Sequence, residues 1–257
     1  MPLKLLTTAK EEVLELLFPI KCAVCEKETG GKRKNKLICT DCLKELSPSF
    51  NFYCPLCEAR TSDGKLCFSC QLIIGNGPAQ RGNGKNPFYL DRLLHPFSYK
   101  DFKIQKIIKA FKYRFIKDLE VPLGRLMIKY LNKIKDKIEL GNYIILPVPL
   151  HKRKFNQRGY NQSELLAVQI AKFLSGKVVK ECLLKTKSTK DQAQLKEGER
   201  IGNLKNVFVC QKPESVSGKN ILLVDDVYTT GATMAECARI LKEAGAKEII
   251  GLTIARG

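Results

Sequence analysis

The sequence predicts an α/β protein whose mostly parallel sheet is flanked by helices, with a small cysteine-rich domain in front of it. Two observations support this fold class. Over the second half of the chain, apolar runs of strand length alternate with helical patterns, as they do in α/β proteins. Before them, four Cys-x-x-Cys pairs lie between Cys22 and Cys70. A chain of 257 residues has room for one sizeable domain and a smaller one.

The N-terminal segment has the pattern of a short amphipathic helix that ends at Pro19. Acidic residues stand where a secretory signal would need an apolar run, namely Glu11, Glu12 and Glu15. No apolar run reaches the length of about 18 residues that a transmembrane helix needs, so the sequence predicts no transmembrane segment. We therefore expect a cytoplasmic protein.

Eight cysteines form the four pairs, and their spacing is typical of metal ligands. They are Cys22, Cys25, Cys39, Cys42, Cys54, Cys57, Cys67 and Cys70. Two such pairs complete a tetrahedral four-thiolate zinc site, which is structural because no position stays open for a substrate. Disulfides do not suit a cytoplasmic chain, and a redox dithiol would not need four copies. Iron–sulfur ligation is a remaining alternative.

The order in which the pairs combine is less certain from sequence. Short loops favour sequential pairing, because each closes at a small entropic cost, but interleaved pairing stays open. A segment this small builds little core without metal, so we expect zinc to supply much of its folding energy. The isolated cysteines Cys182, Cys210 and Cys237 stand in apolar contexts and are expected to be small buried residues.

Residues 75–87 are crowded with Gly, Asn and Pro and lack a periodic apolar pattern, which predicts a linker. We therefore divide the chain into residues 1–74, with the N-terminal helix and the metal sites, and residues 88–257, with the α/β domain. In that domain, strands are predicted at 142–150, 177–186, 206–210, 220–224 and 248–255, and helices at 160–176 and 232–244.

Net charge favours an anionic partner. Lys and Arg outnumber Asp and Glu by 45 to 26, a formal charge of +19. Such an excess suits nucleic acid, phosphorylated substrates or an anionic membrane face, although it also simply raises solubility. Residues 99–120 fit both interpretations, a surface for an anionic partner and a merely solvated helix face. An apolar helical stripe is formed by Ile104, Ile107, Ile108, Phe111 and Phe115, and the remaining face carries Lys103, Lys106, Lys109, Lys112 and Lys117.

Two unusual loops, 151–159 and 225–233, follow predicted strands, where ligands bind in parallel sheets. In the second loop, Asp225 and Asp226 precede a turn and a helix, whose free N–H groups favour a phosphate. Gly231 lets the backbone approach an anion, and hydroxyl donors come from Thr229, Thr230 and Thr233. Carboxylates suit vicinal hydroxyls, so the pattern predicts a ribose 5-phosphate site; the alternative is an exposed strand end with a capping aspartate.

The stretch ILLVDDVYTTGAT resembles the phosphoribosyl pyrophosphate signature of type I phosphoribosyltransferases. The resemblance implies that fold for the α/β domain. It also implies that the catalytic pair Asp225 and Asp226 holds the ribose hydroxyls. The 5-phosphate would be held by Thr229, Thr230, Gly231, Ala232 and Thr233.

A closer resemblance covers nearly the whole chain. LPVPLHKRKFNQRGYNQSELLA, the segment 189–208, and the four cysteine pairs ahead of KAFKYR are together similar to the ComF family. This resemblance implies a double zinc ribbon with two structural zinc ions in front of the phosphoribosyltransferase domain. It also implies a role in DNA uptake during natural transformation, handling single-stranded DNA, with other DNA-uptake proteins as further partners.

The transfer chemistry assigns further residues. Diphosphate leaves during phosphoribosyl transfer, so cations and Mg²⁺ must take up its charge. The loop after LPVPL supplies Lys152, Arg153, Lys154, Arg158 and Gly159, unless it is only a basic surface loop. The polar segment 186–200 is expected to cover the site and exclude water, with contacts from Gln192 and Arg200. His151 is expected to bond to backbone rather than to act as a base.

Two functions follow from these observations. The favoured one is a ComF-like protein that binds phosphoribosyl pyrophosphate and acts in single-stranded DNA uptake. The alternative is a phosphoribosyltransferase that acts on an unidentified base or amine acceptor in nucleotide metabolism. Nothing in the sequence identifies the acceptor.

Overall fold

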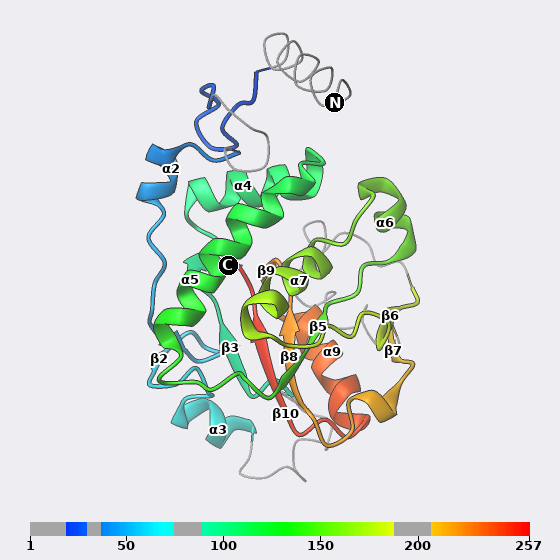
Figure 1. The fold of residues 1–257 in the computed structure, drawn as a ribbon. Helices are drawn as coiled ribbons and strands as arrows, with labels where there is room; N and C mark the ends of the chain where they lie inside the picture. The colour runs from blue at the N-terminus through cyan, green and yellow to red at the C-terminus, as the bar shows by residue number, and fades with distance from the viewer. Residues whose placement is uncertain (1–18, 30–36, 75–88, 188–206) are drawn as a thin grey trace.

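The computed structural model of the chain describes residues 19–29, 37–74, 89–187 and 207–257 (Figure 1). Three predictions fall outside these ranges and stay predictions. They are the N-terminal helix, the 75–87 linker, and the contacts of Gln192 and Arg200.

The cysteine-rich part contains two short units built on the same plan. Its elements are α2 (Thr40–Glu45), β1 (Phe52–Tyr53), β2 (Arg60–Thr61) and α3 (Phe68–Ile74). In each unit the first cysteine pair forms a turn, and the second lies at the start of a helix. Cys39 is the N-cap of α2, and Cys67 immediately precedes α3. Each turn is followed by a glutamate with left-handed backbone, Glu26 at φ 62° and Glu58 at φ 65°.

The main sheet has four parallel strands in the order β3-β10-β8-β5. Their bounds are β3 (Arg92–Leu94), β10 (Glu248–Leu252), β8 (Asn220–Val224) and β5 (Tyr143–Pro147). The strands end together, since Val224 pairs with both Leu252 and Pro147. The predicted parallel sheet is therefore confirmed, with the central strand β8 leading directly to the two aspartates.

Three of these strands continue, after a short break, into a second parallel sheet of order β4-β11-β9. Its strands are β4 (Phe97–Ser98), β11 (Ala255–Arg256) and β9 (Val227–Tyr228). The predicted strand 248–255 is thus two strands, interrupted at Thr253 and Ile254. Asp225 and Asp226 occupy the corresponding break between β8 and β9. The break matters because it places these side chains between the two sheets, directly after the central strand β8.

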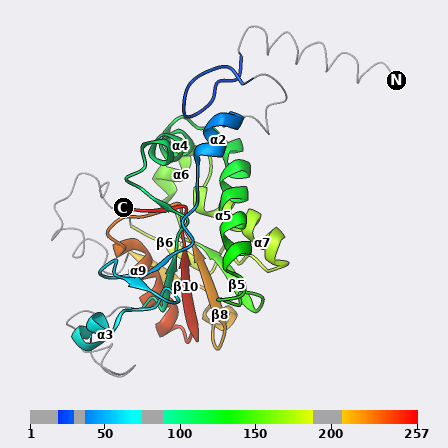
Figure 2. The same ribbon diagram turned by 90° about the vertical axis from the view of Figure 1, so that its left-hand side faces the viewer.

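Helices cover both faces of the main sheet, and Figure 2 shows α5 and α7 on one side with α9 on the other. The helices of this domain are α4 (Phe102–Tyr113), α5 (Glu120–Ile134), α6 (Lys152–Arg158), α7 (Gln162–Leu174) and α9 (Ala232–Glu243), with 3₁₀ turns at Lys117–Leu119 and Pro213–Ser215. Alternate residues of β8 face opposite ways. Leu222 and Val224 pack with α4, α5 and α7, whereas Ile221 and Leu223 pack with α9.

Two predicted strands, 177–186 and 206–210, lie mostly outside the main sheet, although Val178 in the first of them forms a parallel bridge with Ile145 of β5. β6 (Leu183–Lys185) and β7 (Phe208–Cys210) pair only with each other, antiparallel. Phe208 is buried, whereas Val209 is exposed, so the pair has one covered face rather than the two that a central strand needs. Cys182 and Cys237 are buried as predicted. Cys210 is half-buried, so the prediction of a buried residue is wrong for it.

The apolar stripe of residues 99–120 is confirmed over α4, where Ile104, Ile107, Ile108 and Phe111 are fully buried. Phe115 does not belong to this stripe. α4 ends at Tyr113, and Phe115 lies beyond it, exposed and with a positive φ of 56°. The positive φ turns the chain away from the helix axis, which removes Phe115 from the packed face.

The lysine face of α4 is not the solvated surface that the sequence allowed. Lys103 forms an ion pair with Glu45, and the Lys106 Nζ donates to the Val24 carbonyl oxygen at 2.9 Å. Lys112 turns inward to the aspartate pair. These lysines therefore bind other parts of the chain, and only some of the basic excess is free for an external partner.

The cysteine-rich part and the sheet share a hydrophobic core. Cys22, Leu46 and Phe52 lie in the same buried cluster as Ile104 and Ile108 of α4. None of the described helices is long and apolar enough to cross a membrane. The boundaries of the two domains at residues 75–87 stay a prediction.

Candidate functional site

The two aspartates have different surroundings. Asp225 is half-buried, and its Oδ1 accepts hydrogen bonds from the Ser163 Oγ at 2.7 Å and from the Asp226 backbone N–H at 2.8 Å. Burial, and then repulsion from Asp226, raise the pKa of Asp225 to about 7, although Lys112 and Ser163 act in the opposite direction. Asp225 is therefore a carboxylate that gains or loses a proton near neutral pH.

Lys112 neutralises the second aspartate. Its Nζ lies 2.8 Å from the Asp226 Oδ1, and the Asp226 side chain is buried. Burial opposes the charge of Lys112, but attraction to Asp226 outweighs it and the pKa of Lys112 is raised. The sequence pattern allowed Lys112 to be either a solvated lysine or a contact for an anionic partner, and neither interpretation included this ion pair. Its position did carry a signal, since Lys112 continues the i, i+4 row of Ile104 and Ile108.

The turn after the aspartates leads into α9. Gly231 is the N-cap of this 12-residue helix and has a left-handed backbone with φ 74°. A Cβ at position 231 would lie 2.1 Å from the Tyr228 Oη, so only glycine fits there. Thr229 and Thr230 are exposed, and Ala232 begins the helix with Thr233 behind it. A helix N-terminus with exposed hydroxyls in front of it suits an anion.

The basic segment after β5 is a short helix, α6, rather than the predicted loop. His151 is its N-cap, and the His151 Nδ1 accepts from the Arg153 N–H at 3.1 Å, which confirms the predicted backbone bond. Lys152 and Arg153 are exposed, and Gly159 ends the helix with φ 73°. Exposed cations at the helix start are available to a multiply charged anion.

Arg158 is less accessible than these two cations. It donates to the Gln162 Oε1 at 3.1 Å, and its guanidinium lies 5.3 Å from the centre of the Tyr113 ring. It therefore joins α6 to the end of α4. Of the predicted diphosphate-binding residues, Lys152 and Arg153 are the more open to a ligand.

The start of α7 connects the two loops. The Asn161 Nδ2 donates to the Val148 carbonyl oxygen at 3.0 Å and fixes the chain after β5. Two residues later, Ser163 reaches Asp225. Ser163 was not among the predicted site residues, although it lies in the stretch that resembles the ComF family. The start of α7 thus contacts the chain just after β5 and the chain just after β8, two strands that lie side by side in Figure 1.

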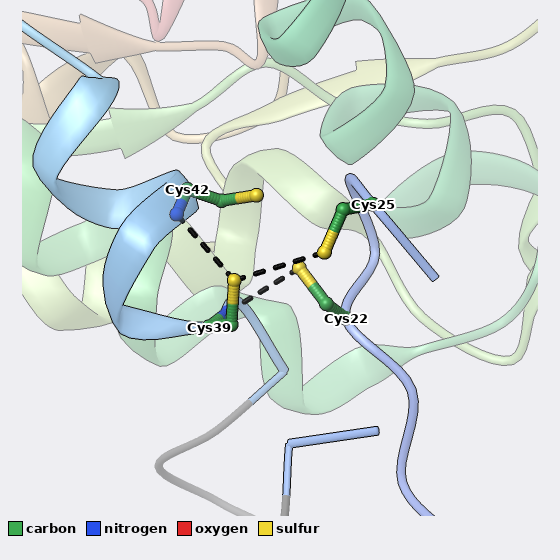
Figure 3. A group of neighbouring side chains, drawn as sticks. All are labelled: Cys22, Cys25, Cys39 and Cys42. Atoms are coloured by element: carbon green, nitrogen blue, oxygen red, sulfur yellow. Dashed lines mark hydrogen bonds between the residues drawn. The ribbon is translucent and has the colours of Figure 1, made fainter. Parts of the chain in front are cut away.

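The eight cysteines form two sets, each made of consecutive pairs. Within each set the sulfur atoms lie within 4.8 Å of one another. Figure 3 shows the first set, in which the Cys25 and Cys39 sulfurs are 3.7 Å apart. In the second set, the Cys57 and Cys67 sulfurs are 3.5 Å apart. Tetrahedral Zn–S bonds of about 2.3 Å place neighbouring sulfurs about 3.8 Å apart, so both sets fit zinc. Sequential pairing is therefore confirmed.

Backbone amides support the thiolate form in each set. Cys22 Sγ accepts from the Cys39 N–H at 3.3 Å and from the Val24 N–H at 3.5 Å. Burial opposes ionisation, but these bonds outweigh it and lower the pKa of Cys22 to about 7. Cys54 in the second set has its pKa lowered to about 7 in the same way. Thiolates are the form that binds metal.

Family models match both parts of the chain. Residues 161–257 match the phosphoribosyl transferase domain, and residues 13–71 match the double zinc ribbon domain. The fold and the two cysteine sets therefore define a protein with a phosphoribosyltransferase-like α/β domain behind a double zinc ribbon, as the sequence predicted.

Curated relatives extend the match over most of the chain. The DNA utilization protein YhgH of Shigella flexneri is 30% identical over 82% of this chain and 93% of its own length. Competence protein ComFC of Bacillus subtilis is 26% identical over 87% of this chain and 86% of its own length. Competence protein F of Haemophilus influenzae is 27% identical over 82% of this chain and 93% of its own length. The chain belongs to the ComF family.

Proposed function

We propose that this protein binds phosphoribosyl pyrophosphate. The observation that carries the proposal is the aspartate pair in the break between β8 and β9, followed by the left-handed turn at Gly231 and the N-terminus of α9. Asp225 and Asp226 hold the ribose hydroxyls, and the turn Thr229–Thr233 receives the 5-phosphate. Lys152 and Arg153 take up the diphosphate, and Arg158, Gly159, Gln192 and Arg200 complete the predicted binding set.

Two metals belong to this proposal. The double zinc ribbon carries two structural zinc ions, one on each cysteine set. Magnesium enters with the diphosphate, whose charge it neutralises, and carboxylate oxygens such as those of Asp225 suit it as ligands. Elemental analysis should show two zinc ions per chain and no iron.

We further propose that the protein handles single-stranded DNA in the cytoplasm during natural transformation. The names of the relatives, a DNA utilization protein and two competence proteins, support this proposal. So do exposed aromatic residues and cations on α4 and just after its end. They are Phe102, Lys109, Tyr113, Phe115 and Lys117. Aromatic rings stack on bases and cations contact the phosphates, without sequence preference.

An enzymatic function is the second candidate, supported by the match to the phosphoribosyl transferase domain. The two candidates share the sugar-phosphate site, so binding alone does not separate them. Calorimetric titration with Mg²⁺ and phosphoribosyl pyrophosphate tests the site itself. Undetectable binding would contradict both candidate functions, because both require this site. Release of diphosphate on adding bases or amines would establish transfer.

A further inference from the structure

The second zinc ribbon unit contacts Tyr228, the residue immediately before the phosphate turn (Thr229–Thr233). The Tyr228 hydroxyl donates to the Pro55 carbonyl oxygen at 3.2 Å. Pro55 lies between Cys54 and Cys57, inside the metal-binding turn. Tyr228 belongs to β9 and precedes the threonines of the turn. A single side chain thus spans the distance between the cysteine set and the turn.

Arg256 strengthens the same contact. Its guanidinium donates to the Cys54 carbonyl oxygen at 2.7 Å and to the Pro55 carbonyl oxygen at 3.2 Å. The guanidinium also lies 5.3 Å from the centre of the Tyr228 ring, and its Nε is 3.2 Å from the Glu58 carboxylate. Arg256 and Tyr228 are both buried, so these bonds are protected from water.

Tyr228 in turn shapes the turn at Gly231. The tyrosine ring fills the space that a side chain at position 231 would need, with the Tyr228 Cζ 2.2 Å from the position of such a Cβ. The left-handed backbone of Gly231 therefore lies against a ring whose hydroxyl is fixed by the metal-binding turn. A shift of Pro55 would move the ring, and with it the N-terminus of α9.

We propose that the second cysteine set (Cys54, Cys57, Cys67 and Cys70) positions the phosphate turn through Tyr228, so that metal binding there and phosphoribosyl pyrophosphate binding strengthen each other. The proposal rests on the proposed function for its ligand. Coupling between two sites is reciprocal, so the ligand must also retain the metal. Tyr228 is a positioning residue, because its ring packs against Gly231 of the turn and does not itself contact the ligand.

The first cysteine set (Cys22, Cys25, Cys39 and Cys42) provides a matched control. Its metal-binding turn is held by equivalent contacts, in which Lys106 donates to the Val24 carbonyl oxygen and Arg114 lies 3.5 Å from Glu26. Both cations belong to α4 or its C-cap, rather than to the phosphate turn. Disruption of the first set should therefore disturb the turn less than disruption of the second set, because its effect would have to pass through α4.

The first experiment uses amide hydrogen exchange and needs no ligand. Zinc-loaded chains carrying Cys57→Ser with Cys67→Ser should exchange the amides of residues 227–235 at least about tenfold faster than the parent. Chains carrying Cys25→Ser with Cys39→Ser should exchange them clearly more slowly than the second-set variant. Equal rates in the two double variants would overturn the proposal.

Tyr228→Phe gives a test that preserves all eight cysteines. It should release one of two zinc ions to a chelator several-fold faster than the parent, while Tyr113→Phe should not. Phosphoribosyl pyrophosphate should slow the release of that one ion in the parent. Unchanged release in Tyr228→Phe would overturn the coupling. If the parent does not bind phosphoribosyl pyrophosphate, the proposed function fails, and the hydrogen-exchange comparison still decides whether the second set positions the turn.

Discussion

The ammonium of Lys112 lies 2.8 Å from the Asp226 carboxylate and joins α4 to the end of the central strand. Two adjacent carboxylates in a partly buried break would repel each other without such a cation. Lys112 thus allows Asp225 and Asp226 to lie side by side. Because α4 also holds the first metal-binding turn through Lys106, one helix links the acidic pair to a zinc ribbon unit.

Replacing Lys112 should destabilise the fold. Lys112→Gln leaves a buried Asp226 without its cation, and losing one partner of such a pair should lower the free energy of unfolding by about 3–5 kcal/mol. Lys109→Gln, on the exposed side of the same helix, should change it by less than about 0.5 kcal/mol. Urea unfolding of both variants makes the comparison. A Lys112→Gln chain as stable as Lys109→Gln would mean that the ion pair contributes nothing.

The aspartate pair should be required for ligand binding. Losing one charge-assisted hydrogen bond costs about 1.5–3 kcal/mol, so Asp226→Ala should weaken phosphoribosyl pyrophosphate binding roughly tenfold or more. Asp136→Ala, at an exposed position after α5, controls for the loss of a negative charge. Calorimetry provides the affinities. Parental affinity in a chain with both Asp225→Ala and Asp226→Ala would refute the assignment.

The raised pKa of Asp225 predicts how stability depends on pH. The pKa of Asp225 is about 7 in the folded chain, whereas its ordinary value, which applies to the unfolded chain, is 3.8. Between pH 3.8 and pH 7 the folded state therefore binds more protons than the unfolded state. The contribution of Asp225 to stability is therefore complete below about pH 4 and is lost as pH rises to 7. Asp225→Asn removes it. Denaturant unfolding from pH 4 to 8 measures the free energy of unfolding of parent and variant. As pH rises, the parent should lose stability relative to Asp225→Asn; a constant difference would contradict the raised pKa.

Metal removal should affect both parts of the chain. Each cysteine set holds together a segment with little core of its own, so chelation should unfold the zinc ribbon units. Because Leu46 and Phe52 share a buried cluster with Ile104 and Ile108, it should also lower the melting temperature of the α/β domain. Calorimetric scans with and without a chelator test this. A second transition at an unchanged temperature would show that the domain does not depend on the ribbons.

Local patterns carried the parts of the fold and site that could be predicted. The cysteine spacing predicted both metal sets, and the alternating strands and helices predicted the parallel sheet. Contacts between distant segments left no pattern that identifies both partners. Lys112 meets Asp226, and Tyr228 meets Pro55, only because the fold brings their segments together. Likewise the apolar runs of β6 and β7 indicated strands but not their partners, because pairing depends on which faces neighbouring elements cover.

Single-stranded DNA should bind at the outer surface of α4, with a steep dependence on salt. Lys106 and Lys112 hold internal partners, so changing them would test folding rather than DNA binding. Lys109 and Lys117 are exposed, and each phosphate contact they make should contribute about −0.7 to the slope of log K against log salt. Lys109→Gln with Lys117→Gln should therefore reduce the slope by about 1.4 at most.

Lys219→Gln with Lys247→Gln removes the same charge at the opposite end of the sheet, where β8 and β10 begin, and should leave the slope unchanged. The aromatic contribution is separate from charge. Tyr113→Ala should cost about 1–3 kcal/mol of binding without altering the slope, because stacking releases no counterions. Fluorescence polarisation with a labelled oligonucleotide at several salt concentrations measures all three variants. Equal slopes in the two lysine pairs would move the DNA site away from α4, and undetectable binding near physiological salt would leave the small-molecule site as the function to pursue.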